Sequence, residues 1–144
     1  MKNIIVAVDF SDLTDTVLAQ AVPLAAAFSS RLCLLHVAEA DPDFVGYDVG
    51  PKTTRDAVAG RFRDQHKALQ RIAEEVRASG LDCEALLVQG PYVEKIISEA
   101  EKIGADIIVI GAHSKGLLSR VLLGSVSAGV LQESKVPVLV VPAT

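Results

Sequence analysis

The amino-acid sequence predicts a doubly wound α/β fold, a three-layer sandwich around a five-stranded parallel sheet. Short continuous apolar runs, typical of strands covered on both faces, alternate along the chain with longer amphipathic segments, typical of helices. The 144 residues, 50% hydrophobic and 22% charged, suit one compact core. There is no internal repeat and no linker rich in proline and glycine, so we expect one domain over residues 1–144.

The first strand is expected over Asn3 to Val8, and a helix follows it. Ser11 offers a hydroxyl group as N-cap of that helix, and Asp12 and Asp15 in its first turn suit the positive end of the helix dipole. Pro23 falls inside the same amphipathic pattern. Because proline removes one backbone donor, we expect a single helix that bends there.

The second strand is predicted over Arg31 to Val37. Residues Glu39 to Asp56 follow; they are polar, contain two prolines and two glycines, and show no period, which indicates a long loop. A second helix is expected from about Thr54 to Ser79, since its apolar residues form one stripe. Gly80 is well placed to end that helix.

The second half of the chain continues the same alternation of strand and helix. The expected elements, strand and helix in turn, are Cys83 to Val88, Tyr92 to Ile103, Asp106 to Ile110, Ser125 to Ser134 and Val136 to Val141. Right-handed crossovers leave few topologies for this pattern. We expect the Rossmann-like strand order 3-2-1-4-5, in which strands one and four are neighbours where the winding reverses, and ligands bind beyond the strand ends at that point.

Composition argues against several classes of partner. The formal net charge of −4 disfavours broad binding to nucleic acid or to anionic lipid. No apolar run approaches the length of a membrane span, and the N-terminal run is too short for a signal peptide. Cys33 and Cys83, the two cysteines, lack metal-ligand spacing. We therefore expect a cytoplasmic protein with no metal site, no membrane partner and no nucleic-acid partner.

Two segments leave the predicted sheet at the point where the winding reverses. Asp9 follows strand one, and a stretch that begins with Gly111 follows strand four. The last helix then starts at Gly124-Ser125, where its unpaired N–H groups suit a phosphate chain. A carboxylate at Asp9 could accept hydrogen bonds from ribose hydroxyls or hold a divalent ion through water.

Each of these residues also has a plainer interpretation. Gly111 could be an ordinary strand-to-loop turn, and Gly124-Ser125 an ordinary helix N-cap. Asp9 could merely cap the helix that follows it. His113 suits a solvated surface histidine, while His36 on an apolar strand suits a buried packing group.

The joint spacing of the glycines resembles a known motif. Gly111-Ala112-His113-Ser114, nine further residues and Gly124-Ser125 are similar to the glycine motif of ATP-binding universal stress proteins, in which G, two residues, G and nine residues precede G and then S or T. The segments IIVAVDFSD, LLHV, ADIIVIGAHSKG, SRVLLGSVSAGVL and VPVLVV resemble that family in order and spacing, over the whole chain. One departure is Ser114, which stands where the motif has its second glycine.

The resemblance implies a nucleotide site made of main-chain groups and a few side chains. Asp9 would lie near the ribose and phosphates, with main-chain groups of Ala7 and Val37 framing the adenine. The other residues implied are Ile110 and Gly111 in the pocket, and His113, Ser114, Gly124, Ser125, Val126 and Ser127 around the triphosphate. The implied ligand is ATP, with Mg²⁺ as a possible companion ion.

Three functions follow from this resemblance. The first is an ATP-binding regulatory module of the stress response, which the family implies to be a homodimer joined through Val136 to Val141. The second is a nucleotide-free protein of the same fold that acts through its dimer surface and the Glu39 to Asp56 segment, a reading that Ser114 favours. The third is a slow ATP hydrolase. Apart from Asp9 and His113, however, the sequence offers no convincing set of residues to act as catalytic base and nucleophile, and the typical phosphate-loop motifs are missing.

Overall fold

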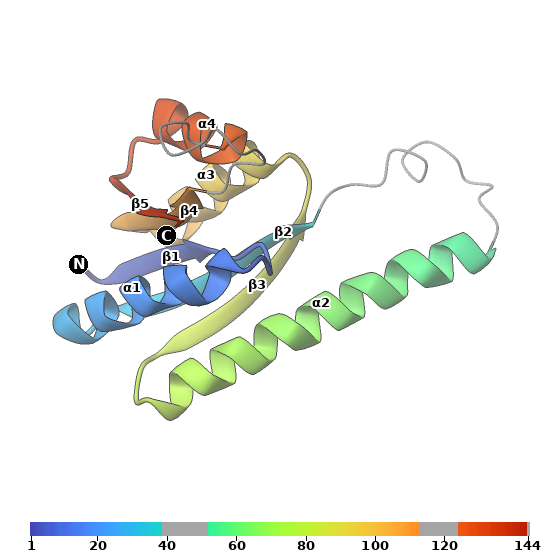
Figure 1. Cartoon of the computed structure of the whole chain (residues 1–144), viewed down its shortest axis with the longest axis horizontal. Coiled ribbons are helices and arrows are strands. Elements are labelled where there is room, and N and C mark those ends of the chain that lie inside the picture. Colours follow the sequence, from blue (N-terminus) through green and yellow to red (C-terminus); the bar gives the residue numbers. More distant parts are fainter. Residues whose placement is uncertain (39–51, 113–123, 144) are drawn as a thin grey trace.

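The computed structural model describes residues 1–38, 52–112 and 124–143, which form alternating strands and helices (Figure 1). The elements in chain order are β1 Asn3–Ala7, α1 Leu13–Phe28, β2 Arg31–Ala38, α2 Lys52–Ala78, β3 Cys83–Gln89, α3 Tyr92–Ile103, β4 Ile107–Ala112, α4 Ser125–Glu133 and β5 Val138–Pro142.

The five strands form one parallel sheet of order β3-β2-β1-β4-β5, which confirms the predicted fold class and topology. β1 lies in the middle and pairs with β2 on one side and β4 on the other. In that pairing Val6 stands opposite Leu34 and Val109. The strand order therefore reverses at β1, and β3 and β5 form the edges of the sheet.

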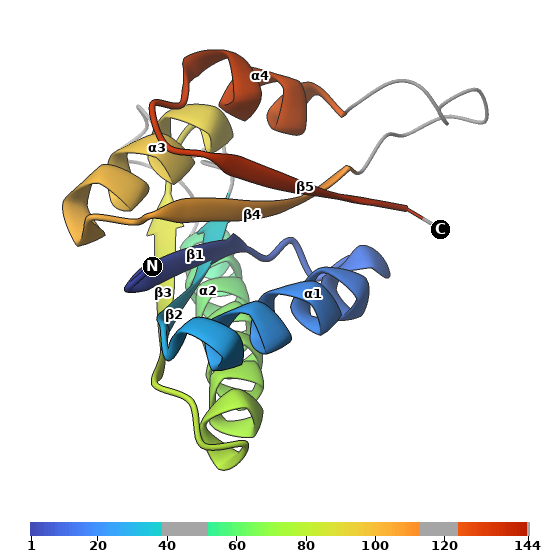
Figure 2. The same ribbon diagram turned by 90° about the vertical axis from the view of Figure 1, so that its left-hand side faces the viewer.

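Helices cover both faces of the sheet, with α1 and α2 on one face and α3 and α4 on the other (Figure 2). Each face has its own apolar core, because consecutive strand residues point to opposite sides. The α1 and α2 side holds Ile4, Val6, Leu32, Leu34, Val109 and Val141 among others. The α3 and α4 side holds Ile5, Cys33, Leu35, Val37, Ile108 and Ile110 among others.

The start of α1 differs from the prediction by one residue. Asp12, rather than Ser11, is the N-cap residue, and its own side chain makes no capping bond. The Ser11 hydroxyl still serves the helix end, since its Oγ accepts the Leu13 N–H at 3.2 Å. The helix then runs through Pro23 as one element and ends at Phe28, with Ser29 as its C-cap residue at a φ of 53°.

The second helix begins earlier than its sequence pattern predicts. α2 starts at Lys52, so the expected loop from Glu39 to Asp56 is wrong over its last residues. In the sequence a proline comes directly before Lys52, and proline is a residue type that favours the start of a helix. The buried part of the helix is its second half, where Leu69 and Ala73 have no exposed surface.

The last strand is shorter at its start than the predicted Val136 to Val141. β5 begins at Val138 and extends to Pro142. The reason is a tight turn before it, in which the Ser134 hydroxyl both accepts the Val136 N–H at 3.0 Å and donates to the Val136 oxygen at 2.7 Å. Other predicted element ends differ from the observed ones by at most two residues.

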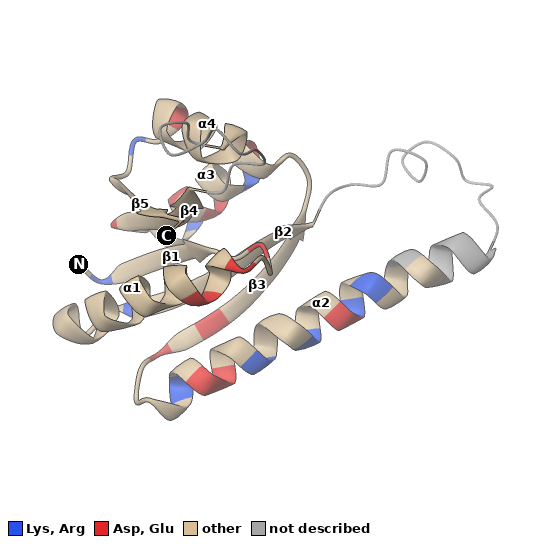
Figure 3. Ribbon diagram, in the orientation of Figure 1, with Lys and Arg blue, Asp and Glu red and all other residues tan. Residues whose placement is uncertain are grey.

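The surface of α2 carries both signs of charge along its length (Figure 3). Arg63, Lys67 and Arg71 share the helix with Asp64 and with two glutamates near its end. This mixture is typical of a solvated helix face rather than of a surface that follows a phosphate backbone. Among the described helices, none has the length and apolar character that crossing a bilayer requires.

Candidate functional site

The candidate site lies at the carboxyl ends of β1 and β4, which are adjacent because the strand order reverses there. After β1 the chain turns through Asp9 into α1, and β4 ends with Gly111 and Ala112. α4 then begins at Ser125, with Gly124 as its N-cap residue. The topology thus brings residues about a hundred positions apart in the sequence to one edge of the sheet.

Asp9 is exposed, and its carboxylate already shapes the loop that leads into α1. Its Oδ1 accepts the N–H of Ser11 at 2.9 Å and the hydroxyl of Thr14 at 3.4 Å. Asp9 is therefore not the N-cap residue of α1, which is Asp12; its carboxylate instead orders the loop before the helix. A carboxylate has two oxygens with several lone pairs, so this role is compatible with accepting further hydrogen bonds from a ligand.

The N-terminus of α4 presents backbone donors without a side-chain cap. Gly124 has no side chain that could accept the first-turn N–H groups, and no acidic residue lies in that turn. The first backbone bond of the helix joins the Ala128 N–H to the Gly124 oxygen at 2.9 Å. The N–H groups of Ser125, Val126 and Ser127 therefore precede the helical hydrogen-bond ladder, and the helix dipole makes their end attractive to an anion.

Ser127 has a structural partner inside the protein. Its side chain is buried, and its hydroxyl donates to the Gly111 carbonyl oxygen at 2.7 Å. This bond ties the first turn of α4 to the end of β4. The hydroxyl proton is engaged there, so what Ser127 can offer a phosphate in this arrangement is its backbone N–H.

Gly111 is needed by the packing of α1. A Cβ atom at this position would overlap Cδ2 of Leu13 and would lie 3.2 Å from Cγ2 of Val17. The missing side chain lets the first turns of α1 lie directly against the end of β4. The resemblance to the family implies that Gly111 belongs to the pocket, and the structure adds a contact with α1 that the glycine motif alone does not reveal.

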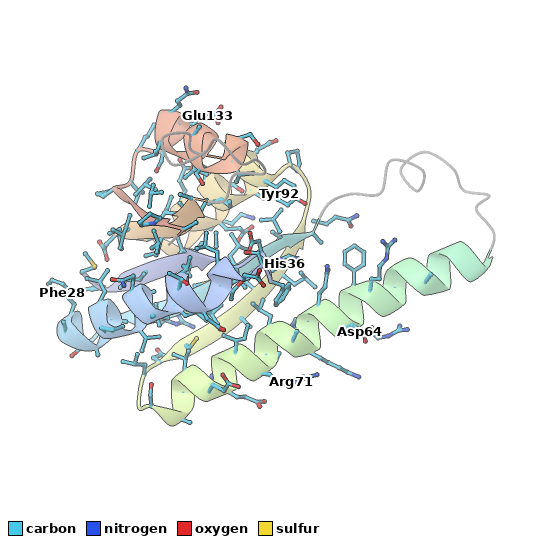
Figure 4. The ribbon with its side chains drawn as sticks, viewed as in Figure 1. Phe28, His36, Asp64, Arg71, Tyr92 and Glu133 are labelled. Atoms are coloured by element: carbon cyan, nitrogen blue, oxygen red, sulfur yellow. The ribbon has the colours of Figure 1, made fainter. Side chains whose placement is uncertain are left out.

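Where β1 leaves the sheet, a histidine from β2 reaches across to it. His36 is buried, and its Nδ1 lies 2.7 Å from the Val8 carbonyl oxygen (Figure 4). Its ring also contacts the ring of Phe10, with 4.5 Å between the centroids. Phe10 has a left-handed φ of 59°, which a residue with a side chain adopts rarely. The prediction of a buried His36 is confirmed, but sequence reasoning missed these contacts.

Most of the site residues expected from the sequence fall within the described structure. The ones it places at the carboxyl edge are Ala7, Asp9, Val37, Ile110, Gly111, Gly124, Ser125, Val126 and Ser127. Ala7 ends β1, Val37 is the last residue but one of the neighbouring β2, and Ile110 and Gly111 lie near the end of β4. His113 and Ser114 lie outside the described residues.

Metal and thiol chemistry find little support in the described part of the chain. Among residues 1–38, 52–112 and 124–143, no three His, Cys, Asp or Glu side chains gather where they could hold an ion. The two cysteines are free and face opposite sides of the sheet, since Cys33 belongs to one core and Cys83 to the other. Burial raises the pKa of Cys33 to about 12 and that of Cys83 to about 11.

These raised pKa values predict unreactive thiols. At pH 8 the thiolate fraction of Cys83 is expected to be roughly a hundredfold below that of an exposed cysteine, because burial disfavours the charged form. Labelling of the native protein with a disulfide reagent should be slower than labelling after denaturation by at least that factor. Equal rates in native and unfolded protein would contradict the burial of both thiols.

The comparisons with known proteins agree with this architecture. The model of the universal stress protein family matches residues 1–142. A universal stress protein of Thermus aquaticus is 33% identical over 146 residues, which cover 97% of this chain and 98% of the relative.

Solved structures show the same fold. The structure of protein MJ0577 from Methanocaldococcus jannaschii is similar with a TM-score of 0.81 and 28% identity, covering 99% of this chain and 96% of the other. A universal stress protein from Archaeoglobus fulgidus, solved in complex with dAMP, has a TM-score of 0.67 at 24% identity, with 98% of each chain covered. From the family match over nearly all of its length, this chain belongs to the universal stress protein family.

Proposed function

We propose that this protein is a regulatory module of the stress response that binds an adenine nucleotide, ATP with Mg²⁺, at the carboxyl edge of its sheet. The observation that carries this proposal is the juxtaposition of Asp9 after β1 with the uncapped N-terminus of α4 beyond β4. A carboxylate can accept from ribose hydroxyls, and a free helix N-terminus attracts phosphates. The two groups flank the same strand ends.

The helix termini differ in a way that supports phosphate binding at α4. The first turn of α1 contains Asp15, and its leading N–H groups are partly taken by Ser11. The first turn of α3 contains Glu94. Negative charge at these two ends repels an anion, whereas the first turn of α4 has neither an acidic residue nor a side-chain cap.

Adenine and ribose would lie nearer β1 and β2. Main-chain groups of Ala7 and Val37 at the ends of these strands are the family's frame for the base, and Asp9 follows on the same side. The dAMP complex of the Archaeoglobus protein supports an adenine nucleotide as ligand of this fold. Mg²⁺ would be held mainly by phosphate oxygens and by Asp9 through water, because the described residues offer no cluster of metal ligands.

Calorimetric titration of the nucleotide-stripped protein with ATP and Mg²⁺ tests the proposal. We expect saturable binding by the natural protein and tighter binding by Ser114→Gly, by about tenfold to thirtyfold. If the glycine position of the motif requires a left-handed backbone, a residue with a Cβ atom there costs about 1 to 2 kcal/mol. Asp9→Asn serves as a control for the loop structure, since the amide oxygen can still accept the Ser11 N–H while the negative charge is removed.

The other outcomes of this titration are equally informative. Binding only after Ser114→Gly would favour the alternative function, a nucleotide-free member of the family that works through protein contacts. The absence of binding by both proteins would contradict the proposed pocket. Release of phosphate above that of an Asp9→Ala variant would indicate hydrolysis as well as binding.

We also propose that the protein is a cytoplasmic homodimer of one domain, residues 1–144, joined through β5. β5 pairs only with β4, so its outer edge offers backbone groups to a second chain. Val138 and Val140 pack into the core beside α3 and α4, while Leu139 on the other face keeps 36% of its surface exposed. An exposed leucine beside an unpaired strand edge suits a contact between two copies.

The dimer is tested with Leu139→Lys, which places a charge on β5 without disturbing the valines beneath. We expect the natural protein to sediment as a dimer and this variant as a monomer, because a buried lysine without a partner opposes association. Leu131→Lys is the matched control, since Leu131 is similarly exposed, at 42%, but belongs to α4 and not to the edge strand. A natural protein that sediments as a monomer would refute the dimer, and a Leu139→Lys dimer would refute this interface.

A further inference from the structure

The hydrogen bonds between β1 and β2 follow a regular parallel ladder up to the point where β1 ends. At the start of the ladder the Arg31 N–H donates to the Lys2 oxygen at 2.8 Å, and at its end the Val8 N–H donates to the Leu35 oxygen at 2.8 Å. In a parallel ladder, the N–H of one residue donates to a residue of the neighbouring strand. The C=O of the same residue then accepts from the residue two positions further along that neighbouring strand. Continued by one step, the ladder would place the Val37 N–H on the Val8 oxygen.

A side chain occupies that oxygen instead. Nδ1 of His36 lies 2.7 Å from it, and because a carbonyl oxygen can only accept, Nδ1 is the donor. In the part of the chain that the structure describes, no backbone bond joins the Val37 N–H to the Val8 oxygen. The pairing of β1 with β2 thus ends one step early, at the oxygen to which the imidazole bonds.

The freed groups of Val37 face a defined direction. Alternate residues of β2 turn their backbone groups to opposite neighbours: the Leu32 N–H donates to Asp82 beside β3, and the Arg31 N–H donates toward β1. Val37 and Arg31 are an even number of positions apart on β2, so the backbone groups of Val37 point to the same side as those of Arg31. The N–H and C=O of Val37 therefore both point to the β1 side, past the end of that strand. One donor and one acceptor side by side complement the edge of adenine, which presents a ring nitrogen and an amino group.

We propose that His36 is a positioning residue of the nucleotide site, which takes the Val8 oxygen and so leaves the Val37 N–H for the base. This inference rests on the proposed function. His36 also holds the loop beyond β1, since its ring contacts Phe10, the residue after Asp9. The left-handed backbone of Phe10 is unfavourable for a residue with a side chain, and the contact with His36 offsets that strain.

Three variants separate positioning from mere stability. His36→Leu removes the donor and fills similar space. His36→Asn keeps an N–H donor on the atom bonded to Cγ, as Nδ1 is in histidine. Ser30→Ala is the matched control: Ser30 is also buried and donates one side-chain bond to a carbonyl oxygen, that of Met1 at 2.9 Å, but at the opposite end of the sheet.

Titration with ATP and Mg²⁺ should show at least tenfold weaker binding by His36→Leu than by the natural protein, which corresponds to the loss of about one hydrogen bond. His36→Asn should recover affinity to within about threefold of the natural protein, and Ser30→Ala should bind as the natural protein does. Equal affinity of the natural protein and His36→Leu would overturn the inference, and so would a loss as large in Ser30→Ala.

A second measurement decides the inference even without nucleotide. Scalar coupling across hydrogen bonds, observed by NMR, should connect the Val37 nitrogen with the Val8 carbonyl carbon in His36→Leu, where the ladder can extend, and should be absent in the natural protein. A coupling already present in the natural protein would overturn the inference. If the natural protein binds no ATP but gains this coupling on substitution, the proposed function fails while the role of His36 in ending the ladder stands.

Discussion

Replacing Leu69 with alanine is expected to lower the free energy of unfolding by about 3 kcal/mol. Leu69 has no exposed surface, and it anchors the second half of α2 to the core shared with β2 and β3. Truncation removes buried methyl groups and leaves a cavity that the sheet cannot close. Urea unfolding followed by circular dichroism gives the free energy, provided that the slope of the transition is unchanged.

Leu131→Ala is the matched control for this experiment. It deletes the same atoms from α4 at a position that is 42% exposed, and we expect a change within about 0.5 kcal/mol. Comparable losses at Leu69 and Leu131 would contradict the described packing of α2. A large loss at Leu69 alone would confirm that α2 is held through its second half.

Gly111→Ala is expected to destabilise the protein by about 2 kcal/mol, although alanine normally stabilises a strand relative to glycine. The added Cβ would overlap Cδ2 of Leu13 and lie 3.0 Å from its Cγ, so the Leu13 side chain, and with it the start of α1, is pushed away from the end of β4. The same movement shifts the loop that holds Asp9. Gly111→Ala should therefore also weaken ATP binding, if the nucleotide lies where we propose.

A double-mutant cycle isolates the cause of this effect. In a Leu13→Ala background the space beside Gly111 is open, and the cost of Gly111→Ala should fall below about 1 kcal/mol. Gly60→Ala on α2 is the control glycine, because within the described residues the nearest atom to its added Cβ is the tip of Arg63 at 4.0 Å. It should stabilise the helix by up to about 1 kcal/mol. An unchanged cost of Gly111→Ala without the Leu13 side chain would refute the steric explanation.

Much of the fold follows from the pattern of apolar residues. α3 lies over Tyr92–Ile103 as predicted, because its stripe is amphipathic and Gly104 ends it with a φ of 63°. The ends of β5 and α1 were predicted less well. They depend on local hydrogen bonds, those of the Ser134 and Ser11 hydroxyls, that compete with the regular pattern and leave no mark in the periodicity.

In the candidate site, too, the sequence predicts some features and not others. The positions of Asp9 and Gly124 at the ends of β1 and α4 could be predicted, because carboxyl ends of parallel strands share one edge. The partners of Ser127 and His36 could not be predicted. Each bonds to the carbonyl oxygen of a residue distant in the sequence, and no spacing in the sequence specifies which hydroxyl or imidazole meets which oxygen.

By itself, the sequence determined the order of strands and helices, the strand order of the sheet and the family, because apolar periodicity, crossover handedness and motif spacing are properties of the chain. The tertiary structure alone shows that Leu13 fills the space beside Gly111, that Ser127 ties α4 to β4, and that His36 bonds to the Val8 oxygen beyond the end of β1. These contacts join residues 16 to 98 positions apart (127 − 111 = 16 and 111 − 13 = 98). They exist because packing in three dimensions selects partners by distance and shape, which a linear pattern does not record.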